Sequence, residues 1–264
     1  MRGRRRLTAL TLMIVAALVL ASLTVGCGEN KATEAKVTTL EPGILMMGSD
    51  TFYPPFESIE GDKVVGFDVD LATELTKRLG LELDIIRTRW DEIIPGLQSD
   101  KYDIIMSAML ITPEHSKEIS FSDPYIDADQ SIAVKTGSPI NSEDDLEDKV
   151  VGVWLDTPGQ MTAEKMSGLK EIRKFDNILR AFENLELGEI DAIVNDYPVN
   201  AYFSKTRGKT EVIKKIITQE KYGIGVKKGN NRLRLAINDA LKRIKEDGTY
   251  NNIYKKWFGI KKTT

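Results

Sequence analysis

The sequence has very little of the chemistry that disulfides and metal centres require. Its 264 residues contain one cysteine, Cys27, and one histidine, His115. A disulfide within the chain needs two cysteines, and a zinc site needs several histidine or cysteine ligands, so we expect neither. The sequence also has no P-loop, no GxGxxG fingerprint and no GxSxG nucleophile motif. We therefore expect no metal and no cofactor.

An excess of positive charge is missing as well. The chain has 37 Lys and Arg residues against 40 Asp and Glu residues. The first 26 residues carry four arginines and no acidic residue, so the remainder has 33 basic and 40 acidic residues and a net charge of −7. Nucleic acids are bound by basic patches with interleaved aromatic residues, and no such patch occurs here. We expect no nucleic-acid partner.

The N-terminus differs in composition from the rest of the chain. Arg2 and residues 4–6 form a basic segment, and residues 7–25 are apolar apart from Thr and Ser. This pattern is typical of a secretory signal peptide, which we place at residues 1–26. An uncleaved transmembrane anchor is the alternative, because the apolar run approaches the ~20 residues that span a bilayer. Both interpretations place the protein in the periplasm or on the outer face of the cytoplasmic membrane.

Cys27 follows the apolar run directly and has three interpretations. It is a buried small residue, a reactive thiol or the acylated first residue of a bacterial lipoprotein. Its position favours the third, and "LTVGC" resembles a lipobox, although Thr24 stands where Leu or Val is usual. We therefore expect lipidation of Cys27 and a lipid anchor. The polar residues that follow, in the range 27–39, read as a flexible tether.

From residue 43 onward, apolar strands alternate with amphipathic helices. In "GFDVDLATELTKRLG" a bulky apolar residue recurs every fourth position, which places these side chains on one helix face. The same spacing in "NRLRLAINDALKRIKEDG" predicts a second long helix, and "SEDDLED" predicts a short one with Ser142 as its N-cap. Repeated strand–helix units predict an α/β fold with a parallel sheet covered by helices on both faces.

The strand–helix pattern forms two blocks, which we interpret as two lobes. Residues 40–128 and 222–264 form lobe 1 in this interpretation, and residues 129–221 form lobe 2. The chain then crosses between the lobes twice. Two such crossovers make a hinge, and ligands of open α/β sheets bind beyond the carboxyl ends of strands, in this case in a cleft between the lobes.

Aromatic and polar residues gather just past the predicted strand ends. They lie in "SDTFYPPFE", at Trp90, in "SAMLITPEH" and in "VNDYP". Together they offer the aromatic faces, hydroxyls and carboxylates that suit a small polar or zwitterionic ligand. Each also has a simpler explanation, since an aromatic residue near a strand end is often core and Asp196 is a possible helix cap. His115 is either a catalytic base or a solvated residue on a helix, and no nucleophile motif supports catalysis.

These segments resemble the polar amino-acid-binding proteins of ABC importers, known as family 3 solute-binding proteins. The resemblance covers roughly residues 43–259 and is carried by "DTFYPPFE", "VGFDVDLATELTKRLG", "WDEIIPGLQSDKYDIIMSAMLITPEHSKEISFSDPY", "LELGEIDAIVND" and "DGTYNNIYKKWFG". It implies a two-lobed periplasmic-binding-protein fold of type II with two hinge crossovers. It also implies a monomer that binds one small polar ligand, an amino acid or a related molecule, and docks on an ABC permease.

The resemblance also assigns roles to individual residues. Asp196 corresponds to the carboxylate that pairs with the ligand α-ammonium, and Tyr53 with Trp90 to the aromatic pair that sandwiches its side chain. The segment around Ser107 and the loop "LDTPGQ" correspond to the parts that hydrogen-bond the ligand and its α-carboxylate. The residues expected at the ligand are Asp50, Phe52, Tyr53, Trp90, Ser107, Ala108, Met109, Leu110, His115, Trp154, Thr157, Gly159, Asn195 and Asp196.

The sequence departs from the family pattern at several of these positions. His115 stands where the family has the arginine that binds the α-carboxylate, and Leu110 where a Ser or Thr is common. Asp156 and Pro158 replace the usual small residues of the lobe 2 loop. An arginine gives a fixed, charged fork, and a histidine does not. We keep two hypotheses: either His115 binds the carboxylate as an imidazolium, or the ligand is atypical, being more cationic or lacking an α-carboxylate.

Capture of a ligand followed by lobe closure, without catalysis, is the function that these observations favour. Two alternatives share the scaffold. One is an enzyme similar to the cyclohexadienyl dehydratases, in which His115, Glu114 or Asp156 supplies acid–base chemistry. The other is a sensor that signals through a separate membrane protein.

Overall fold

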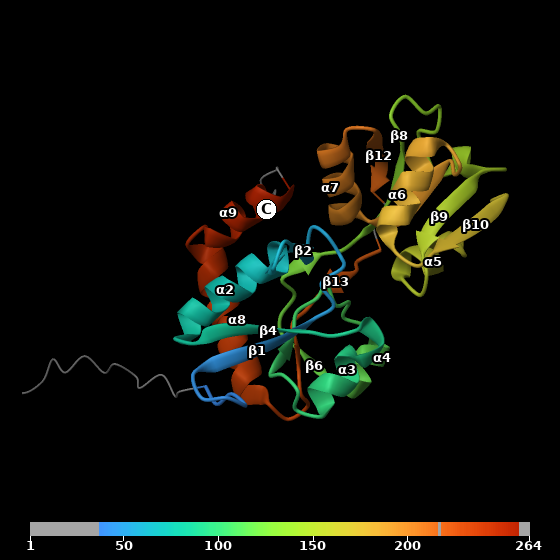
Figure 1. Cartoon of the computed structure of the whole chain (residues 1–264). Coiled ribbons are helices and arrows are strands. Elements are labelled where there is room, and N and C mark those ends of the chain that lie inside the picture. The colour runs from blue at the N-terminus through green and yellow to red at the C-terminus, as the bar shows by residue number, and fades with distance from the viewer. Residues whose placement is uncertain (1–36, 216–217, 259–264) are drawn as a thin grey trace, which may run out of the picture. The chain divides into compact units, whose positions relative to one another are not determined.

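Two five-stranded sheets organise the chain (Figure 1). The structure is a computed structural model that describes residues 37–215 and 218–258. The proposed signal peptide, Cys27 and most of the proposed tether lie outside the described residues. The first sheet has the strand order β4-β1-β5-β14-β6, and the second has the order β10-β9-β11-β8-β12. Each sheet with its helices is called a lobe below, lobe 1 and lobe 2.

Lobe 1 is built on strands that bury side chains on both faces. Leu45 and Met47 pack into one core with α2 and α8, while Met46 contacts a second core with Ile93 and Leu97 of α3. This follows from the period of two along a strand. The elements are β1 (Ile44–Ser49), the β2 (Ser58–Glu60) and β3 (Lys63–Val65) hairpin, α2 (Phe67–Leu79), β4 (Glu82–Arg87), α3 (Trp90–Gln98), β5 (Ile104–Ile105), α4 (Pro113–Glu118), β6 (Ser120–Phe121), β14 (Gly225–Val226), α8 (Asn231–Glu246) and α9 (Thr249–Phe258).

Lobe 2 repeats this arrangement with different helices. Alternate residues of its strands pack against Ala163 of α5 on one face and against Phe182 of α6 and Phe203 of α7 on the other. Its elements are β8 (Gln130–Lys135), a 3₁₀ turn (Asp144–Leu146), β9 (Val150–Trp154), α5 (Pro158–Ala163), β10 (Glu171–Phe175), α6 (Ile178–Leu187), β11 (Ala192–Asp196), α7 (Tyr197–Arg207) and β12 (Thr210–Lys215).

The chain passes between the lobes twice, and the two crossovers pair with each other. The short strands β7 (Ile126–Asp127) and β13 (Lys221–Tyr222) form an antiparallel ribbon. Our proposed lobe boundaries, after residues 128 and 221, fall beside this ribbon, and they stay a proposal. The ribbon places residues 128–130 and 218–220 next to each other, where Ala128 N–H donates to Glu220 O over 2.9 Å.

The predicted apolar helix faces are confirmed, whereas the predicted parallel sheet is wrong in part. Leu71 and Leu75 of α2 are buried, as are Leu233, Ile237 and Ile244 of α8. Both sheets are mixed, because β14 runs antiparallel to β5 and β6, and β8 runs antiparallel to β11 and β12. These antiparallel strands all lie next to a crossover, so the chain enters or leaves the sheet there without the helical connection that a parallel pair requires.

Three local features differ from the prediction. The strands β10 and β12 were not expected, because both are edge strands with charged residues on their exposed side. Ser142 is not an N-cap: the turn begins at Glu143, and Ser142 instead donates its N–H and hydroxyl to Asp145. The loop "LDTPGQ" ends in the short helix α5, which was not predicted.

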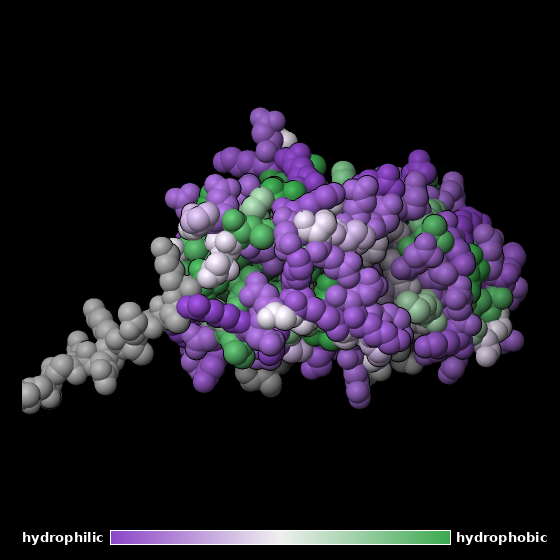
Figure 2. Space-filling model, turned by 90° about the horizontal axis from the view of Figure 1, so that it is seen from below, coloured by the Kyte–Doolittle hydropathy of each residue, from purple (hydrophilic) through white to green (hydrophobic). Residues whose placement is uncertain are grey.

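The described surface is strongly polar. On the face shown in Figure 2, hydrophilic side chains predominate and hydrophobic ones form separate small groups. Charged residues make up 29% of the sequence, which accounts for this appearance. Within residues 37–215 and 218–258, no helix has both the length and the apolar composition needed to cross a membrane.

Candidate functional site

Asp196 is the centre of a buried polar cluster that joins both lobes and both crossovers. It is the last residue of β11 and is 6% exposed. Tyr53, from the loop after β1, donates its hydroxyl to Asp196 Oδ2 over 2.6 Å. Tyr222 donates its hydroxyl to the same oxygen, and Gln130 donates its amide to Oδ1. Gln130 also donates to Glu220 over 2.8 Å, so a second carboxylate belongs to the cluster.

These contacts exclude a helix-capping role for the Asp196 side chain. Asp196 occupies the N-cap position of α7, but its side chain accepts no hydrogen bond from that helix. Burial raises the pKa of Asp196 to about 6, while the hydrogen bonds from Tyr222, Tyr53 and Gln130 act in the opposite direction. An ionised, buried carboxylate at a strand end is suited to bind a cationic group.

The ring of Tyr53 lies between lobe 1 and an aromatic residue of lobe 2. Its centroid is 5.0 Å from that of Trp154, the last residue of β9, and 5.9 Å from that of Phe56. Phe56 in turn contacts Tyr222 edge-on, with centroids 5.2 Å apart. The tyrosine hydroxyls on Asp196 are thus held by a packed aromatic cluster. The ring that contacts Tyr53 across the lobes is that of Trp154. The expected pairing of Tyr53 with Trp90 around a ligand stays a prediction.

Trp90 lines a separate cavity together with two other predicted residues, Met109 and His115. The cavity has a volume of about 300 Å³ and is lined by Trp90, Asp91, Ile93, Ile94, Pro95, Met109, His115 and Glu118. Trp90 begins α3 and is 44% exposed, whereas Met109 is fully buried. Nδ1 of His115 lies 2.9 Å from the carbonyl oxygen of Leu110. A carbonyl only accepts, so this nitrogen carries a hydrogen.

We expect Trp90→Ala to weaken ligand binding by roughly 2- to 12-fold and to leave the free energy of unfolding within about 0.5 kcal/mol of wild type. The side chain is 44% exposed at the start of α3, so its removal leaves no enclosed void. Calorimetric titration and denaturant melts measure the two quantities. Leu235→Ala is the matched control, since Leu235 is 58% exposed on α8. A loss of several kcal/mol in the free energy of unfolding, with unchanged ligand affinity, would show that Trp90 is a core residue and contradict its place in the site.

Ser107 and Ala108 are engaged by buried acids of lobe 1. The Ser107 hydroxyl donates to Glu57 Oε1 over 2.6 Å and accepts the Asp50 N–H over 3.1 Å. Ala108 has a left-handed backbone, with φ of 47°, and its N–H donates to Asp68 Oδ2 over 2.8 Å. Glu57 and Asp68 are both fully buried. These two acids therefore fix the conformation of the segment that follows β5.

Burial dominates the electrostatics of these acids. It raises the pKa of Asp68 to about 7 and that of Asp50 above its ordinary value. The pKa of Glu57 lies well above its ordinary value, because of burial and then the negative charge of Asp68. The side chains of Glu57 and Asp68 hydrogen-bond each other. Two carboxyl groups in such a pair share a proton more readily than they both ionise.

The short helix α5 presses the lobe 2 loop against β11. Gly159 permits this approach, since a Cβ there would lie 2.5 Å from the carbonyl oxygen of Val194. Thr157, the residue before the helix, donates its hydroxyl to the carbonyl of Trp154 over 2.7 Å. The predicted residues Thr157 and Gly159 therefore lie next to the strand that ends in Asp196.

The other predicted residues occupy varied positions. Phe52 is 68% exposed, and Asp50 is buried beside it, accepting the Phe52 N–H over 2.9 Å. Leu110 pairs with Tyr222 in an isolated bridge. Asn195 is buried, and its side-chain nitrogen has no partner among the described atoms.

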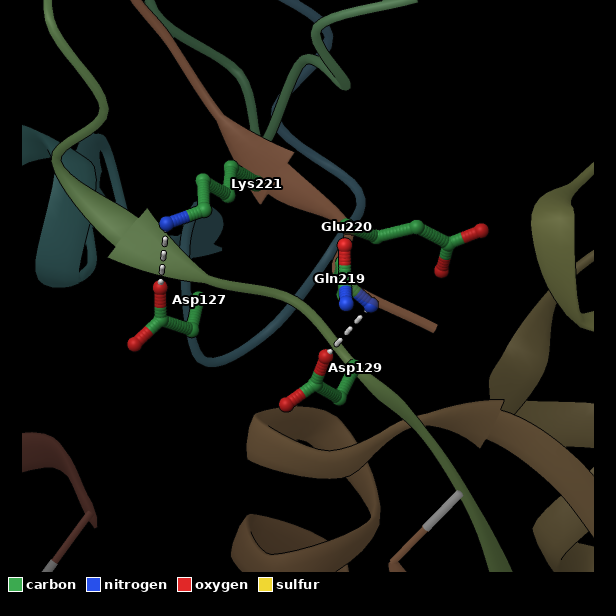
Figure 3. A pocket seen from close by; sticks show the side chains of 5 residues that line it. All are labelled: Asp127, Asp129, Gln219, Glu220 and Lys221. Carbon is green, nitrogen blue, oxygen red and sulfur yellow. Dashed lines mark hydrogen bonds and ion pairs between the residues drawn. The ribbon is translucent and has the colours of Figure 1, made fainter. Parts of the chain in front are cut away.

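Three residues at the centre of the site were not predicted: Gln130, Glu220 and Tyr222. Glu220 and Tyr222 lie on the second crossover, and Gln130 begins β8 opposite Asp196. These approaches depend on tertiary structure, so no spacing along the sequence identifies the three residues. The crossovers also enclose a cavity of about 280 Å³, lined by Asp127, Asp129, Gln219, Glu220 and Lys221 (Figure 3). There Lys221 pairs with Asp127 over 3.5 Å, and the Gln219 N–H donates to Asp129 over 3.0 Å.

No group of three or more His, Cys, Asp and Glu side chains suited to a metal ion occurs within residues 37–215 and 218–258. The donors and acceptors gathered around Asp196 are instead those of a site for a small organic molecule: carboxylates, hydroxyls, amides and aromatic faces.

Comparison with known proteins gives the family. Residues 45–260 match the model of the bacterial extracellular solute-binding proteins, family 3. The chain is 32% identical over 253 residues to a probable histidine-binding protein of Neisseria gonorrhoeae, which covers 93% of this chain and 94% of that one. It is 34% identical over 225 residues to the L-cystine-binding protein TcyJ of Escherichia coli, covering 83% and 84%.

Solved structures agree with this assignment. An ancestral arginine-binding protein bound to arginine has a TM-score of 0.72 and 41% identity, over 82% of this chain and 99% of that one. The ancestral amino-acid-binding protein AncCDT-1, described as a precursor of cyclohexadienyl dehydratase, has a TM-score of 0.73 and 41% identity, over 82% and 96%. The two sheets joined by two crossovers are those of the two-lobed periplasmic-binding-protein fold. This chain belongs to the bacterial extracellular solute-binding proteins, family 3.

Proposed function

We propose that this protein binds an amino acid or a related small polar solute between its lobes and delivers it to an ABC permease. The observation that carries the proposal is the Asp196 cluster, in which a buried carboxylate of lobe 2 meets Tyr53 of lobe 1 and both crossovers. Relatives named as amino-acid-binding proteins of ABC transporters support it.

The proposed mechanism is capture by hinge closure. Within residues 37–215 and 218–258, the chain passes between the lobes at the crossovers beside β7 and β13, so a rotation there separates Tyr53 from Asp196 and opens the site. A ligand that bridges the lobes favours the closed arrangement by as much as its contacts differ between the two states. A closed pair of lobes then presents one face to the permease.

The proposal includes where the protein works. We place it outside the cytoplasmic membrane, in the periplasm or on the outer membrane face, as a monomer anchored by a lipid on Cys27. The composition of residues 1–27 supports the anchor, and the extracytoplasmic family supports the location. Metabolic labelling with a fatty acid tests the anchor, and Cys27→Ala should abolish the label.

A thermal-shift screen of the full-length protein in detergent tests the binding function. The panel contains the 20 amino acids, polyamines, choline and betaines. A compound at 100 times its Kd should add about 2.7 kcal/mol to the free energy of unfolding. Incubation with prephenate or arogenate tests the enzyme alternative: formation of an aromatic product overturns a purely binding role, and a panel in which no compound shifts the melting temperature overturns binding.

A further inference from the structure

Resting on the proposed function, we propose that the ligand is a small organic cation that carries an ammonium or guanidinium group and no carboxylate. The proposal follows from which hydrogen-bonding groups of the site are already engaged within the protein and which remain. A carboxylate needs hydrogen-bond donors or a cation, and a cation needs acceptors or aromatic faces. Four parts of the site give the same result.

Two donors of the lobe 1 segment that the resemblance assigns to ligand binding donate elsewhere. The hydroxyl of Ser107 has one hydrogen, and it is donated to Glu57 over 2.6 Å. The N–H of Ala108 is donated to Asp68 over 2.8 Å. Both acceptors are fully buried acids, which hold these donors firmly. Leu110 adds no hydroxyl to the segment.

His115 replaces an arginine with a ring that, in its neutral form, has an acceptor at the second nitrogen. Nδ1 donates to the carbonyl of Leu110 over 2.9 Å, so the neutral ring presents a lone pair at Nε2. The cavity that His115 lines with Trp90 also contains Glu118, whereas Asp91 there is paired with Arg89 over 2.8 Å. A lone pair, an aromatic face and a carboxylate are partners for a cation.

The side chains of the lobe 2 loop donate elsewhere as well. Pro158 at the start of α5 has no N–H, and Thr157 donates its hydroxyl to Trp154. The N–H of Asp156 is donated to the Gln160 side chain over 3.0 Å, and Asp156 adds a negative charge to the loop. An anion is therefore less favourable here than a neutral or positive group.

In the part of the chain that the structure describes, one acceptor and one neutral donor remain around Asp196, and neither is a cation. The Gln130 side chain is fully buried, and its oxygen has no partner among the described atoms. No Lys or Arg side chain that the structure describes forms an ion pair with Asp50, Asp196 or Glu220. The amide nitrogen of Asn195 is the neutral donor left in the same cluster, and it suits a hydroxyl or carbonyl oxygen. A ligand carboxylate would thus meet negative charge, whereas an ammonium group completes the cluster.

Matched pairs of ligands test the proposal on the full-length protein in detergent. Arginine is compared with agmatine, lysine with cadaverine and histidine with histamine, so each pair differs by one carboxylate. Calorimetric titration should show an amine that binds about tenfold or more tightly than its parent amino acid, since the unmatched carboxylate loses a charge-assisted hydrogen bond. Equal or tighter binding of the amino acids overturns the cation proposal and leaves the transport function standing. Binding of neither the pairs nor any compound of the wider screen overturns both.

His115→Arg tests the reason for the preference. The added guanidinium should tighten the binding of the amino acid and weaken that of the amine, which moves the ratio of their affinities by about tenfold or more. Lys117→Arg is the control, because it places a guanidinium on an exposed position of the same helix and should leave the ratio unchanged. An unchanged ratio in His115→Arg overturns the explanation by the missing carboxylate partner.

Discussion

Asp196→Asn is expected to weaken binding of the tightest ligand by about a hundredfold or more. Loss of one side of a buried charge pair costs about 3–5 kcal/mol, which corresponds to factors of roughly 100 to several thousand in Kd. The variant also turns one acceptor oxygen into an NH₂ group that faces donors. Tyr53 and Tyr222 both donate to Oδ2, so at most one orientation of the amide keeps them satisfied.

Titration calorimetry on Asp196→Asn separates ligand binding from helix capping. If Asp196 acted as the cap of α7, Asn would replace it with little loss, because both residues are good N-caps. Asn177→Asp is the matched control: Asn177 caps α6 by accepting the Arg180 N–H over 3.0 Å. The exchange there should leave ligand affinity unchanged. If Asp196→Asn binds the ligand with wild-type affinity, Asp196 is not part of the binding site.

The same carboxylate gives the binding reaction a pH dependence. The pKa of Asp196 is raised to about 6 by burial, so the free protein loses the negative charge as the pH falls below that value. A cationic ligand requires the ionised form, and affinity should therefore fall by up to tenfold per pH unit below about pH 6. Asp196→Asn should remove this dependence. An affinity that is constant from pH 5 to pH 7 contradicts a role for Asp196 in binding a cation.

Sequence periodicity predicted the elements whose burial is decided locally. The apolar stripes of α2 and α8 face the core because residues four apart share a helix face, and this holds whatever the neighbours are. The strands β10 and β12 were not predicted, because an edge strand needs no continuous apolar run and their pairing partners lie far away in the sequence. The strands next to the crossovers, β8 and β14, run antiparallel to their neighbours, and no local sequence signal specifies this direction.

The candidate site divides in the same way. Trp154 and Asp196 end their strands and Tyr53 follows β1. Ligand contacts concentrate at the carboxyl ends of strands, so position alone singles these residues out. Gln130 reaches Asp196 because β8 pairs with β11 across the sheet, and Tyr222 reaches it from the second crossover. The hydrogen bond from Ser107 to Glu57 could not be predicted from the sequence either, since it joins two residues that are 50 positions apart. A residue role that is inferred by resemblance therefore identifies a ligand only when the hydrogen bonds of that residue are known.

Glu57→Gln is expected to flatten the dependence of stability on pH and to stabilise the protein at neutral pH. In the native protein, Oε1 of Glu57 accepts from Ser107, while Oε2 and Asp68 Oδ1 have no partner among the described atoms. The two side chains are close enough to hydrogen-bond each other, so a proton held between them gives the pair a bond that two carboxylates cannot make. Gln reproduces that arrangement permanently, with its oxygen on Ser107 and its NH₂ on Asp68.

The sign follows from the direction of the pKa shifts. The pKa of Glu57 lies well above its ordinary value and that of Asp68 is about 7, whereas unfolded carboxyl groups titrate near pH 4. Between about pH 4 and pH 7 the native state therefore binds more protons than the unfolded state, and the free energy of unfolding falls as pH rises, by up to about 1.4 kcal/mol per pH unit for each proton. Glu57→Gln removes one of these protons, so its advantage over wild type should grow with pH across this range.

Denaturant melts at pH 4.5, 6 and 7.5 measure this advantage, with Glu60→Gln as a control for the loss of one exposed carboxylate. Asp68→Ala should behave in the opposite way. It removes the acceptor of the Ala108 N–H and of the Tyr125 hydroxyl, which leaves two buried donors unpaired at a cost of about 1–3 kcal/mol each. Ala108 holds a left-handed backbone with the help of that bond, so ligand affinity should fall together with stability. Equal stability of wild type and Glu57→Gln at all three pH values means that the two acids share no proton.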